Sequence, residues 1–318
     1  MKKKKALIFG ISGQDGAYLS HFLLSKNYDV IGTSRDKSKK NLFRLHRLDI
    51  HKKVKVFRGE ATDVKFCKKI IKKNISEIYY LAGESSVVKS FKSPGDTLLS
   101  NSMGIINILE IAKLNKNQTK VFNACSGQMY GNKRKNFFNI NSKIDPQSPY
   151  AVSKASGYWF TKIYRENYNM FCCSGILFNH ESPLRSDEFV TKKVVNGAKK
   201  ILNKKSKNLI LGDINIYRDW GWTPEYVKAY WLMLQKNIPH DLIIGSGKTN
   251  SLKDFVKEVF RLNNISLNKV RVNVKKFKRK LDIKGYKADI SKTKKILKWR
   301  PKISFKKIVY KMVNDELF

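Results

Sequence analysis

Two short stretches of the chain carry side chains that could act together on one substrate. The first, NACSGQMYG at residues 123–131, holds a hydroxyl at Ser126 and an amide at Gln128. The second, SPYAVSK at residues 148–154, holds Tyr150 and Lys154, which share one face of a helix because they are four residues apart. A neighbouring ammonium favours the phenolate form of tyrosine, so this pair could remove a proton from a hydroxyl group.

A glycine-rich turn near the start of the chain indicates what could accompany that proton transfer. The segment GISGQDG at residues 10–16 follows an apolar strand and opens a helix. Gly10 permits the tight turn, Gly13 lets the backbone approach a pyrophosphate, and Gly16 lets helix and strand pack closely. The free N–H groups of the helix N-terminus attract phosphate. The turn predicts a dinucleotide site, and Tyr150 could then act on a sugar hydroxyl while hydride leaves for a nicotinamide.

The end of the second strand, GTSRD, bears on the choice of dinucleotide. Arg35 stands where an NAD-binding protein usually places a carboxylate for the ribose hydroxyls. A guanidinium suits a 2′-phosphate, so we expect NADP, although Asp36 follows directly.

The segments that position these residues alternate between short apolar strands and amphipathic helices. The strands are KALIFG, DVIGTS, VKVF, EIYYLAG, KVFNACS and CCSGILF. This alternation predicts an α/β protein with a Rossmann-type, doubly wound parallel sheet over residues 1–175. The pattern loosens after NHESP. We therefore expect a smaller C-terminal α/β substrate domain over residues 176–318, with segments that return to the first domain.

Composition narrows the classes of partner. The formal net charge of +40 would suit a nucleic-acid binder, but lysines are spread through nearly every expected helix and loop. A coding bias toward Lys, Asn and Ile explains that excess, so nucleic acid is not an expected partner. No apolar run reaches the roughly 18 residues of a membrane span. The four cysteines show neither metal-ligand spacing nor a disulfide framework, so we expect no metal and a reducing cytoplasm.

Longer motifs identify a family. The glycine turn, Ser126 with YG behind it, and Tyr150 with Lys154 resemble the extended short-chain dehydrogenase/reductases. GILFNHESPLRSDEFVTKKV at 175–194 and LGDINIYRDWGWTPEYVKAYWLMLQ at 211–235 resemble the GDP-mannose 4,6-dehydratase family within the epimerase/dehydratase superfamily. SPYAVSK, LAGESSV and LKWRP agree with it. The similarity covers nearly the whole chain.

The resemblance implies an internal redox cycle on GDP-mannose or a related GDP-sugar. In that cycle NADP oxidises C4, a carboxylate takes the C5 proton, water leaves from C6, and the hydride returns to C6. Ser126 takes the place of a threonine that binds the C4 hydroxyl, and Tyr150 and Lys154 form the oxidation pair. The implied GDP contacts are Asn179, Arg218 and Arg279. The implied cofactor contacts are Gly10, Gly13, Gln14, Asp15, Gly16, Arg35, Leu81, Ala82, Gly83, Ser85, Tyr150, Lys154, His180 and Arg185.

The chain departs from the family at the catalytic carboxylate. Gln128 stands where the family has glutamate, and an amide cannot accept the C5 proton. Losing a positioned base costs roughly 10²- to 10⁴-fold in rate. Glu84 of LAGESSV stands where many members have glutamine, so it is a candidate replacement base. Either Glu84 compensates for the missing carboxylate at position 128, or both changes are drift in a protein that catalyses a simpler reaction.

Two other functions therefore stay open. A GDP-sugar 4-epimerase or 4-keto reductase needs Ser126, Tyr150 and Lys154 but no C5 base. A catalytically weak binding protein could also have kept the fold. The resemblance further implies a homodimer or homotetramer, because SRDKSKKNLFRL aligns with a loop that relatives use between subunits.

Overall fold

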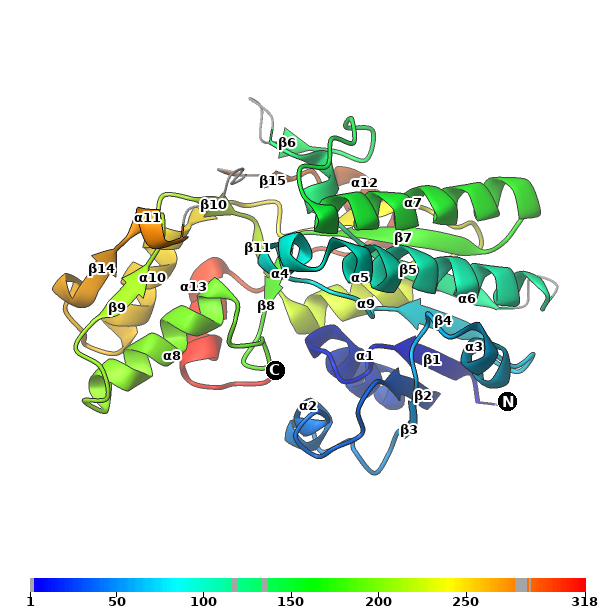
Figure 1. Ribbon diagram of the computed structural model, residues 1–318, viewed down its shortest axis with the longest axis horizontal. Helices are drawn as coiled ribbons and strands as arrows, with labels where there is room; N and C mark the ends of the chain where they lie inside the picture. Colours follow the sequence, from blue (N-terminus) through cyan, green and yellow to red (C-terminus); the bar gives the residue numbers. More distant parts are fainter. Residues whose placement is uncertain (1–2, 116–118, 133–136, 278–284, 286) are drawn as a thin grey trace.

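A seven-stranded parallel sheet organises the larger part of the molecule. The computed structural model describes residues 3–115, 119–132, 137–277, 285 and 287–318 (Figure 1). The strand order is β12-β7-β5-β4-β1-β2-β3. Successive strands are added on one side of β1 up to β3 and on its other side from β4 onward, so the topological switch point lies between β1 and β4. The bounds are β1 (Lys5–Phe9), β2 (Asp29–Ser34), β3 (Lys55–Arg58), β4 (Glu77–Tyr80), β5 (Lys120–Ser126), β7 (Cys172–Leu177) and β12 (Leu242–Ile244).

Helices cover both faces of this sheet because its central strands are apolar on both sides. In β1, Ala6 and Ile8 enter one core, whereas Leu7 and Phe9 enter the other, and all four side chains are fully buried. This is the two-sided burial expected of a parallel sheet. The first core holds α1 (Gln14–Ser25), α2 (Phe43–Arg47) and α9 (Thr223–Leu234). The second holds α3 (Val64–Ile70), α6 (Gly104–Lys113) and α7 (Pro149–Tyr168).

A smaller domain lies beside the sheet, on the left of Figure 1. It has a core of its own, formed by α8 (Val190–Leu202), α10 (Leu252–Leu262), α13 (Phe305–Val313) and the pair β9 (Leu209–Leu211) and β14 (Val270–Val272). The remaining elements are α4 (Val87–Lys92), α5 (Pro94–Leu98), the π-helix η1 (Leu99–Met103), the 3₁₀ helices η2 (Gly127–Tyr130) and η3 (Leu267–Lys269), β6 (Phe137–Phe138), β8 (Asn179–Glu181), β10 (Tyr217–Arg218), β11 (Trp220–Trp222), β13 (Asn250–Ser251), α11 (Val274–Phe277), β15 (Lys287–Ala288) and α12 (Ser291–Leu297).

Segments from beyond residue 176 return to the first sheet. Leu242 of β12 pairs in parallel with Gly175 of β7, and α9 packs against α1. The expected α/β class and doubly wound sheet are confirmed. The division at residues 1–175 and 176–318 stays a proposal, with β12 and α9 as the returning segments.

Helix α7 is fixed at both ends, which matters because it carries Tyr150 and Lys154. At its start, the Ser148 hydroxyl accepts a hydrogen bond of 3.1 Å from the Ala151 amide, and Pro149 occupies the first turn. Near its end, Arg165 binds both carboxylate oxygens of Asp241 at 2.9 and 2.6 Å. No helix in the described part of the chain is long and apolar enough to cross a membrane.

Candidate active site

The predicted site residues lie at the carboxyl ends of the parallel strands. Gly10 follows β1, Arg35 follows β2, Leu81 follows β4, Ser126 ends β5, and Asn179 comes two residues after β7. Parallel strands place these ends along one edge of the sheet, and ligands of open α/β sheets bind there. The parallel sheet therefore brings five predicted site residues, from separate parts of the sequence, to one edge.

The glycine turn is packed so closely that Gly10 and Gly16 have no room for a side chain. Gly10 has φ of +88°, and a Cβ there would lie 2.9 Å from the Cα of Ala82. A Cβ on Gly16 would lie 2.3 Å from the Gly10 carbonyl oxygen, and one on Gly13 would lie 3.2 Å from it. Helix α1 begins after Gly13 without a side-chain cap. The turn thus presents a helix N-terminus to an anion and touches the loop after β4.

Helix α7 runs antiparallel to β5, and this direction determines which residue of the strand each helix position lies beside. Lys154 donates a 2.9 Å hydrogen bond to the Ala124 carbonyl, whereas Asn123 donates a 3.0 Å bond to the Gly157 carbonyl. Successive positions along the helix therefore meet earlier residues of the strand. Tyr150, about one turn before Lys154, is level with the end of β5.

The end of β5 carries the other two side chains of the predicted group. The Ser126 hydroxyl accepts a 3.2 Å hydrogen bond from the backbone N–H of Gln128 and thereby caps η2. Ser126 and Tyr150 are both buried, and Gln128 is partly buried. The structure thus gathers Ser126, Gln128, Tyr150 and Lys154 where β5 ends and α7 begins.

Burial changes the acid–base behaviour of Lys154. Desolvation lowers the pKa of the Lys154 ammonium from 10.5 to about 8, although Cys125 and Asp15 act in the opposite direction. Lys154 is therefore cationic at neutral pH and begins to lose its charge near pH 8. A cation one helical turn from Tyr150 is what a phenolate at that position requires.

Glu84 is held by the backbone of its own loop. Its Oε1 atom accepts hydrogen bonds from the amides of Ser85 at 2.8 Å and Ser86 at 2.7 Å, in front of α4. Gly83, with φ of +114°, lets this loop approach Asn101. The carboxylate therefore has a structural role in the loop after β4, and its action as a base stays a prediction.

Asn101 is a buried polar residue that motif reasoning missed. It lies in η1 with 1% of its surface exposed, and its Nδ2 donates a 3.0 Å hydrogen bond to the Glu84 carbonyl. Its Oδ1 atom has no hydrogen-bond partner among the described residues. The signal available in the sequence was an asparagine shortly before the apolar helix α6, which precedes β5.

His180 pairs with the first turn of α1. Its Nε2 lies 2.8 Å from Asp15 Oδ2, and its Nδ1 lies 2.8 Å from the Phe178 carbonyl. Both neighbours are acceptors, so the ring must donate from both nitrogens, which is the charged form. Burial alone would lower the pKa of His180, but Asp15 outweighs it and raises that pKa. Burial raises the pKa of Asp15, but His180, Tyr230 and Arg185 together bring it down to about 2.

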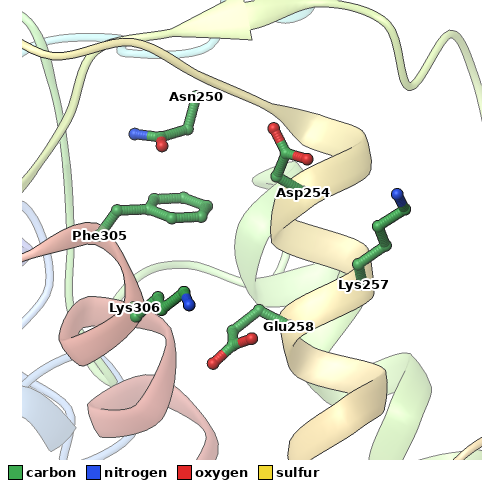
Figure 2. Close-up of a pocket in the computed structure, with 6 residues that line it drawn as sticks. All are labelled: Asn250, Asp254, Lys257, Glu258, Phe305 and Lys306. Atoms are coloured by element: carbon green, nitrogen blue, oxygen red, sulfur yellow. The ribbon is translucent and has the colours of Figure 1, made fainter.

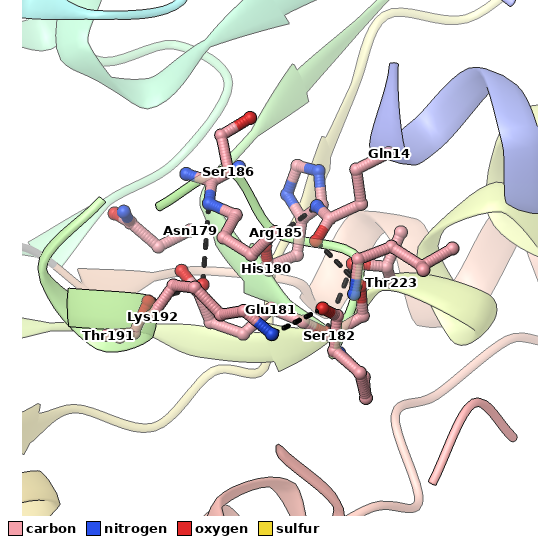
Figure 3. A network of polar contacts seen from close by, with 12 residues as sticks. Gln14, Asn179, His180, Glu181, Ser182, Arg185, Ser186, Thr191, Lys192 and Thr223 are labelled. Carbon is pink, nitrogen blue, oxygen red and sulfur yellow. Dashed lines mark hydrogen bonds and ion pairs between the residues drawn. The ribbon is translucent and has the colours of Figure 1, made fainter. Parts of the chain in front are cut away.

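The strand β8 also holds Gln14 and Arg185 (Figure 3). The Gln14 amide donates to the His180 carbonyl at 3.3 Å and accepts from the Ser182 hydroxyl at 2.7 Å. Arg185 lies 3.4 Å from the buried carboxylate of Glu181. These side chains, expected at the cofactor by resemblance, join α1 to the segment that follows the sheet.

Arg35 is exposed just after β2. The carboxylate of the neighbouring Asp36 is engaged elsewhere and does not compensate the charge of Arg35. The Asp36 carboxylate turns away to the amide and hydroxyl of Ser38, at 2.8 and 2.6 Å. The Ser34 hydroxyl lies 3.1 Å from that of Ser12 in the glycine turn. The end of β2 therefore contacts the predicted dinucleotide turn.

Two of the residues predicted to hold GDP, Asn179 and Arg218, come from short strands outside the seven-stranded sheet. Asn179 begins β8, and Arg218 is buried at the end of β10, where it donates to the Tyr217 carbonyl at 2.8 Å. The adjacent Asp219 accepts backbone hydrogen bonds from Ser246, Gly247 and Ala288. Burial raises the pKa of Asp219 to about 6, although these hydrogen bonds oppose that change. Arg279 lies outside the described residues.

One surface pocket lies elsewhere, between α10 and α13 (Figure 2). It has a volume of about 290 Å³ and is lined by Asn250, Asp254, Lys257, Glu258, Phe305 and Lys306. Asp254 is engaged in the capping box of α10 with Ser251, and Glu258 pairs with Arg261. The pocket belongs to the smaller domain and not to the edge where the predicted residues gather.

Comparison with known proteins agrees with this arrangement. The family model described as GDP-mannose 4,6 dehydratase matches residues 7–312. GDP-mannose 4,6 dehydratase of Drosophila melanogaster is 36% identical over 344 residues, covering 99% of this chain and 87% of the relative. GDP-mannose 4,6 dehydratase 1 of Arabidopsis thaliana is also 36% identical, covering 99% and 90%.

The fold is shared with solved structures of lower sequence identity. The crystal structure of dTDP-glucose 4,6-dehydratase from Bacillus anthracis in complex with NAD superposes with a TM-score of 0.85 at 20% identity, covering 98% of this chain and 96% of that one. The full-length family match and the curated relatives confirm the resemblance read from the motifs. The chain belongs to the GDP-mannose 4,6-dehydratase family of enzymes.

Proposed function

We propose that this protein is a lyase that converts GDP-mannose, or a related GDP-sugar, to a GDP-4-keto-6-deoxy sugar. The observation that carries the proposal is the group at the β5–α7 junction, where buried Lys154 donates to the Ala124 carbonyl and Tyr150, one helical turn earlier, is level with Ser126. This group supports oxidation at C4, and the family gives the substrate class. Asn179, Arg218 and Arg279 are the proposed contacts for GDP, whose diphosphate suits guanidinium groups.

The proposed cofactor is NADP, and the glycine turn fits a dinucleotide. The close approach of Gly10 to Ala82 and of Gly16 to Gly10 brings glycine backbone, without Cβ atoms, to the turn in front of α1. The remaining proposed contacts include Leu81, Gly83 and Ser85. The NAD complex of the Bacillus anthracis enzyme supports the nicotinamide class, and Arg35 favours the 2′-phosphorylated form. When bound, such a cofactor accepts a hydride and returns it.

The chain's own residues manage the protons. Tyr150 acts as a phenolate, which the charge of Lys154 stabilises, and becomes neutral when it takes the proton of the C4 hydroxyl; Ser126 orients that hydroxyl by a hydrogen bond. The C5 proton needs a different acceptor. Glu84, or water held by Gln128, is the proposed acceptor.

Gln128 is also the observation that favours the second candidate function. A GDP-sugar 4-epimerase or 4-keto reductase would use Ser126, Tyr150 and Lys154 and would need no base at C5. If Glu84 remains bound to the amides of Ser85 and Ser86, this simpler chemistry follows. A catalytically weak binding protein is the third candidate, and a GDP-mannose titration beside a salt-dependent filter assay with nucleic acid separates it from the others.

We also propose self-association through an apolar face on α5, η1 and α7. Leu98, Leu99 and Met103 are 40–51% exposed, and Trp159 and Ile163 on the adjacent α7 are 46% and 45% exposed. Several exposed apolar side chains on adjacent helices favour an interface at this face. A dimer or tetramer is expected in sedimentation velocity, and a monomer would refute the assignment.

A reducing location, the cytoplasm, is the proposed compartment. Cys67, Cys125, Cys172 and Cys173 are all free and buried. Burial raises the pKa of Cys67, Cys125 and Cys172 to about 12, so these residues stay in the thiol form at neutral pH.

Replacing Arg35 with alanine tests the cofactor assignment. We expect Arg35→Ala to weaken NADP binding about tenfold or more and to leave NAD binding nearly unchanged, because only NADP offers a 2′-phosphate to the guanidinium. Dissociation constants from fluorescence titration measure this. Arg271→Ala, on exposed β14, is the matched control. An equal loss for both dinucleotides would refute the role of Arg35.

Removing one oxygen atom tests the oxidation step. Tyr150→Phe should lower turnover of GDP-mannose by at least about 10²-fold and leave GDP-sugar binding intact, because the proton acceptor is lost and the ring remains. Mass detection of product and calorimetry of binding measure the two effects. Tyr168→Phe, at the far end of the same helix, should behave as wild type. Retention of most activity by Tyr150→Phe would contradict the mechanism.

A reciprocal pair of substitutions tests the C5 base. Gln128→Glu should raise the rate of water loss from GDP-mannose, because it supplies a carboxylate at the family's position. Glu84→Gln should abolish the wild-type rate if Glu84 is the base, and circular dichroism would show that the loop change leaves the fold intact. No gain from the first variant and no loss from the second would favour the epimerase or reductase.

A further inference from the structure

Asp15 brings a negative charge to the place where the dinucleotide turn must accept an anion. It is the second residue of α1, in the first helical turn after Gly13. Its pKa of about 2 keeps it ionised throughout the neutral range. A helix N-terminus attracts one anion, and a second anion placed beside it would meet like-charge repulsion.

His180 supplies the compensating charge. Its Nε2 lies 2.9 and 2.8 Å from the two oxygens of Asp15, and the Tyr230 hydroxyl donates to the same carboxylate at 2.9 Å. His180 and Tyr230 are at most 8% exposed. Removing one member of a buried ion pair leaves an uncompensated charge, which costs far more than the pair contributes.

The same strand fixes the position of the helix end. Gln14, next to Asp15, donates to the His180 carbonyl and accepts from Ser182. The His180 ring lies 4.7 Å from that of Tyr226 on α9. Strand β8 thus holds the first two residues of α1 by both charge and hydrogen bonds, and it begins with Asn179.

Other cations act on Asp15 from neighbouring elements. Arg185 follows β8, Lys154 belongs to α7, and Arg44 belongs to α2, and each has an electrostatic interaction with Asp15. Each has its own closer partner: Arg185 pairs with Glu181, Lys154 donates to Ala124, and Arg44 donates to Ser12 and Leu184. Among the described residues, His180 is the cation in hydrogen-bonding contact with Asp15.

We propose that His180 is a positioning residue that neutralises Asp15, so that the end of α1 accepts the pyrophosphate of the dinucleotide. This inference rests on the proposed function, because it concerns the same cofactor site. According to this proposal, His180 affects dinucleotide binding through its interaction with Asp15. The damage caused by losing His180 should therefore be repaired by removing the charge of Asp15.

The test is a double-mutant cycle read by dinucleotide binding. Fluorescence titration with NADP should show affinity at least about tenfold weaker for His180→Gln than for wild type. Asp15→Asn combined with His180→Gln should bind within about threefold of Asp15→Asn alone and more tightly than His180→Gln, because without the carboxylate the imidazole has no charge to neutralise. Glu316→Gln removes the carboxylate that pairs with buried Lys311 of α13, away from the site, and controls for loss of stability alone; its affinity should be unchanged.

The outcomes separate the inference from the function on which it rests. Rescue by the double variant supports the inference, as does a His180→Gln protein that fails to fold beside a double variant that folds and binds. Normal binding by His180→Gln, or a double variant as weak as His180→Gln, overturns it. If wild-type protein binds neither NADP nor NAD, the proposed function itself is wrong.

Discussion

The parallel direction of the central strands is the constraint on which the site depends. β1, β2, β4, β5 and β7 run the same way, and the residue groups that follow them come from sequence positions as far apart as 10 and 179. No local motif could bring these groups together. The sheet can do so because its strands are buried on both faces, as the alternating core contacts of β1 show. Substitutions that disturb the register would therefore displace several site residues at once.

Burial of charge distinguishes this edge of the sheet from the lysine-rich surface. Lys154 and His180 are buried and Asp15 is partly buried, and each has a specific partner at 2.8–2.9 Å. Burial lowers the pKa of Lys154, whereas the mutual attraction of Asp15 and His180 moves their pKa values apart. Ionisable groups with such opposed shifts are characteristic of functional sites. Many of the lysines behind the overall charge of +40 are exposed, where solvent and salt screen them.

Much of the fold could be predicted from sequence because its signals are local. Apolar strands such as KALIF alternate with amphipathic helices, and the glycine turn stands between the first strand and the first helix. The pairing of Asp15 with His180 could not be predicted, because it joins residues 165 apart and depends on the course of β8. His180 was expected at the cofactor from resemblance alone. The contacts of Glu84 could not be predicted either, because its sequence position gives no indication that the backbone N–H groups of Ser85 and Ser86 bind its carboxylate.

The central claim is that this chain performs internal oxidation and reduction with loss of water, despite Gln128. The most direct measurement is mass spectrometry and NMR of the product formed from GDP-mannose carrying deuterium at C4. The account predicts a GDP-sugar lighter by one water, with the deuterium moved from C4 to C6. A product that keeps the mass of GDP-mannose, with C4 inverted, would contradict it, as would a dehydrated product that lacks the label at C6.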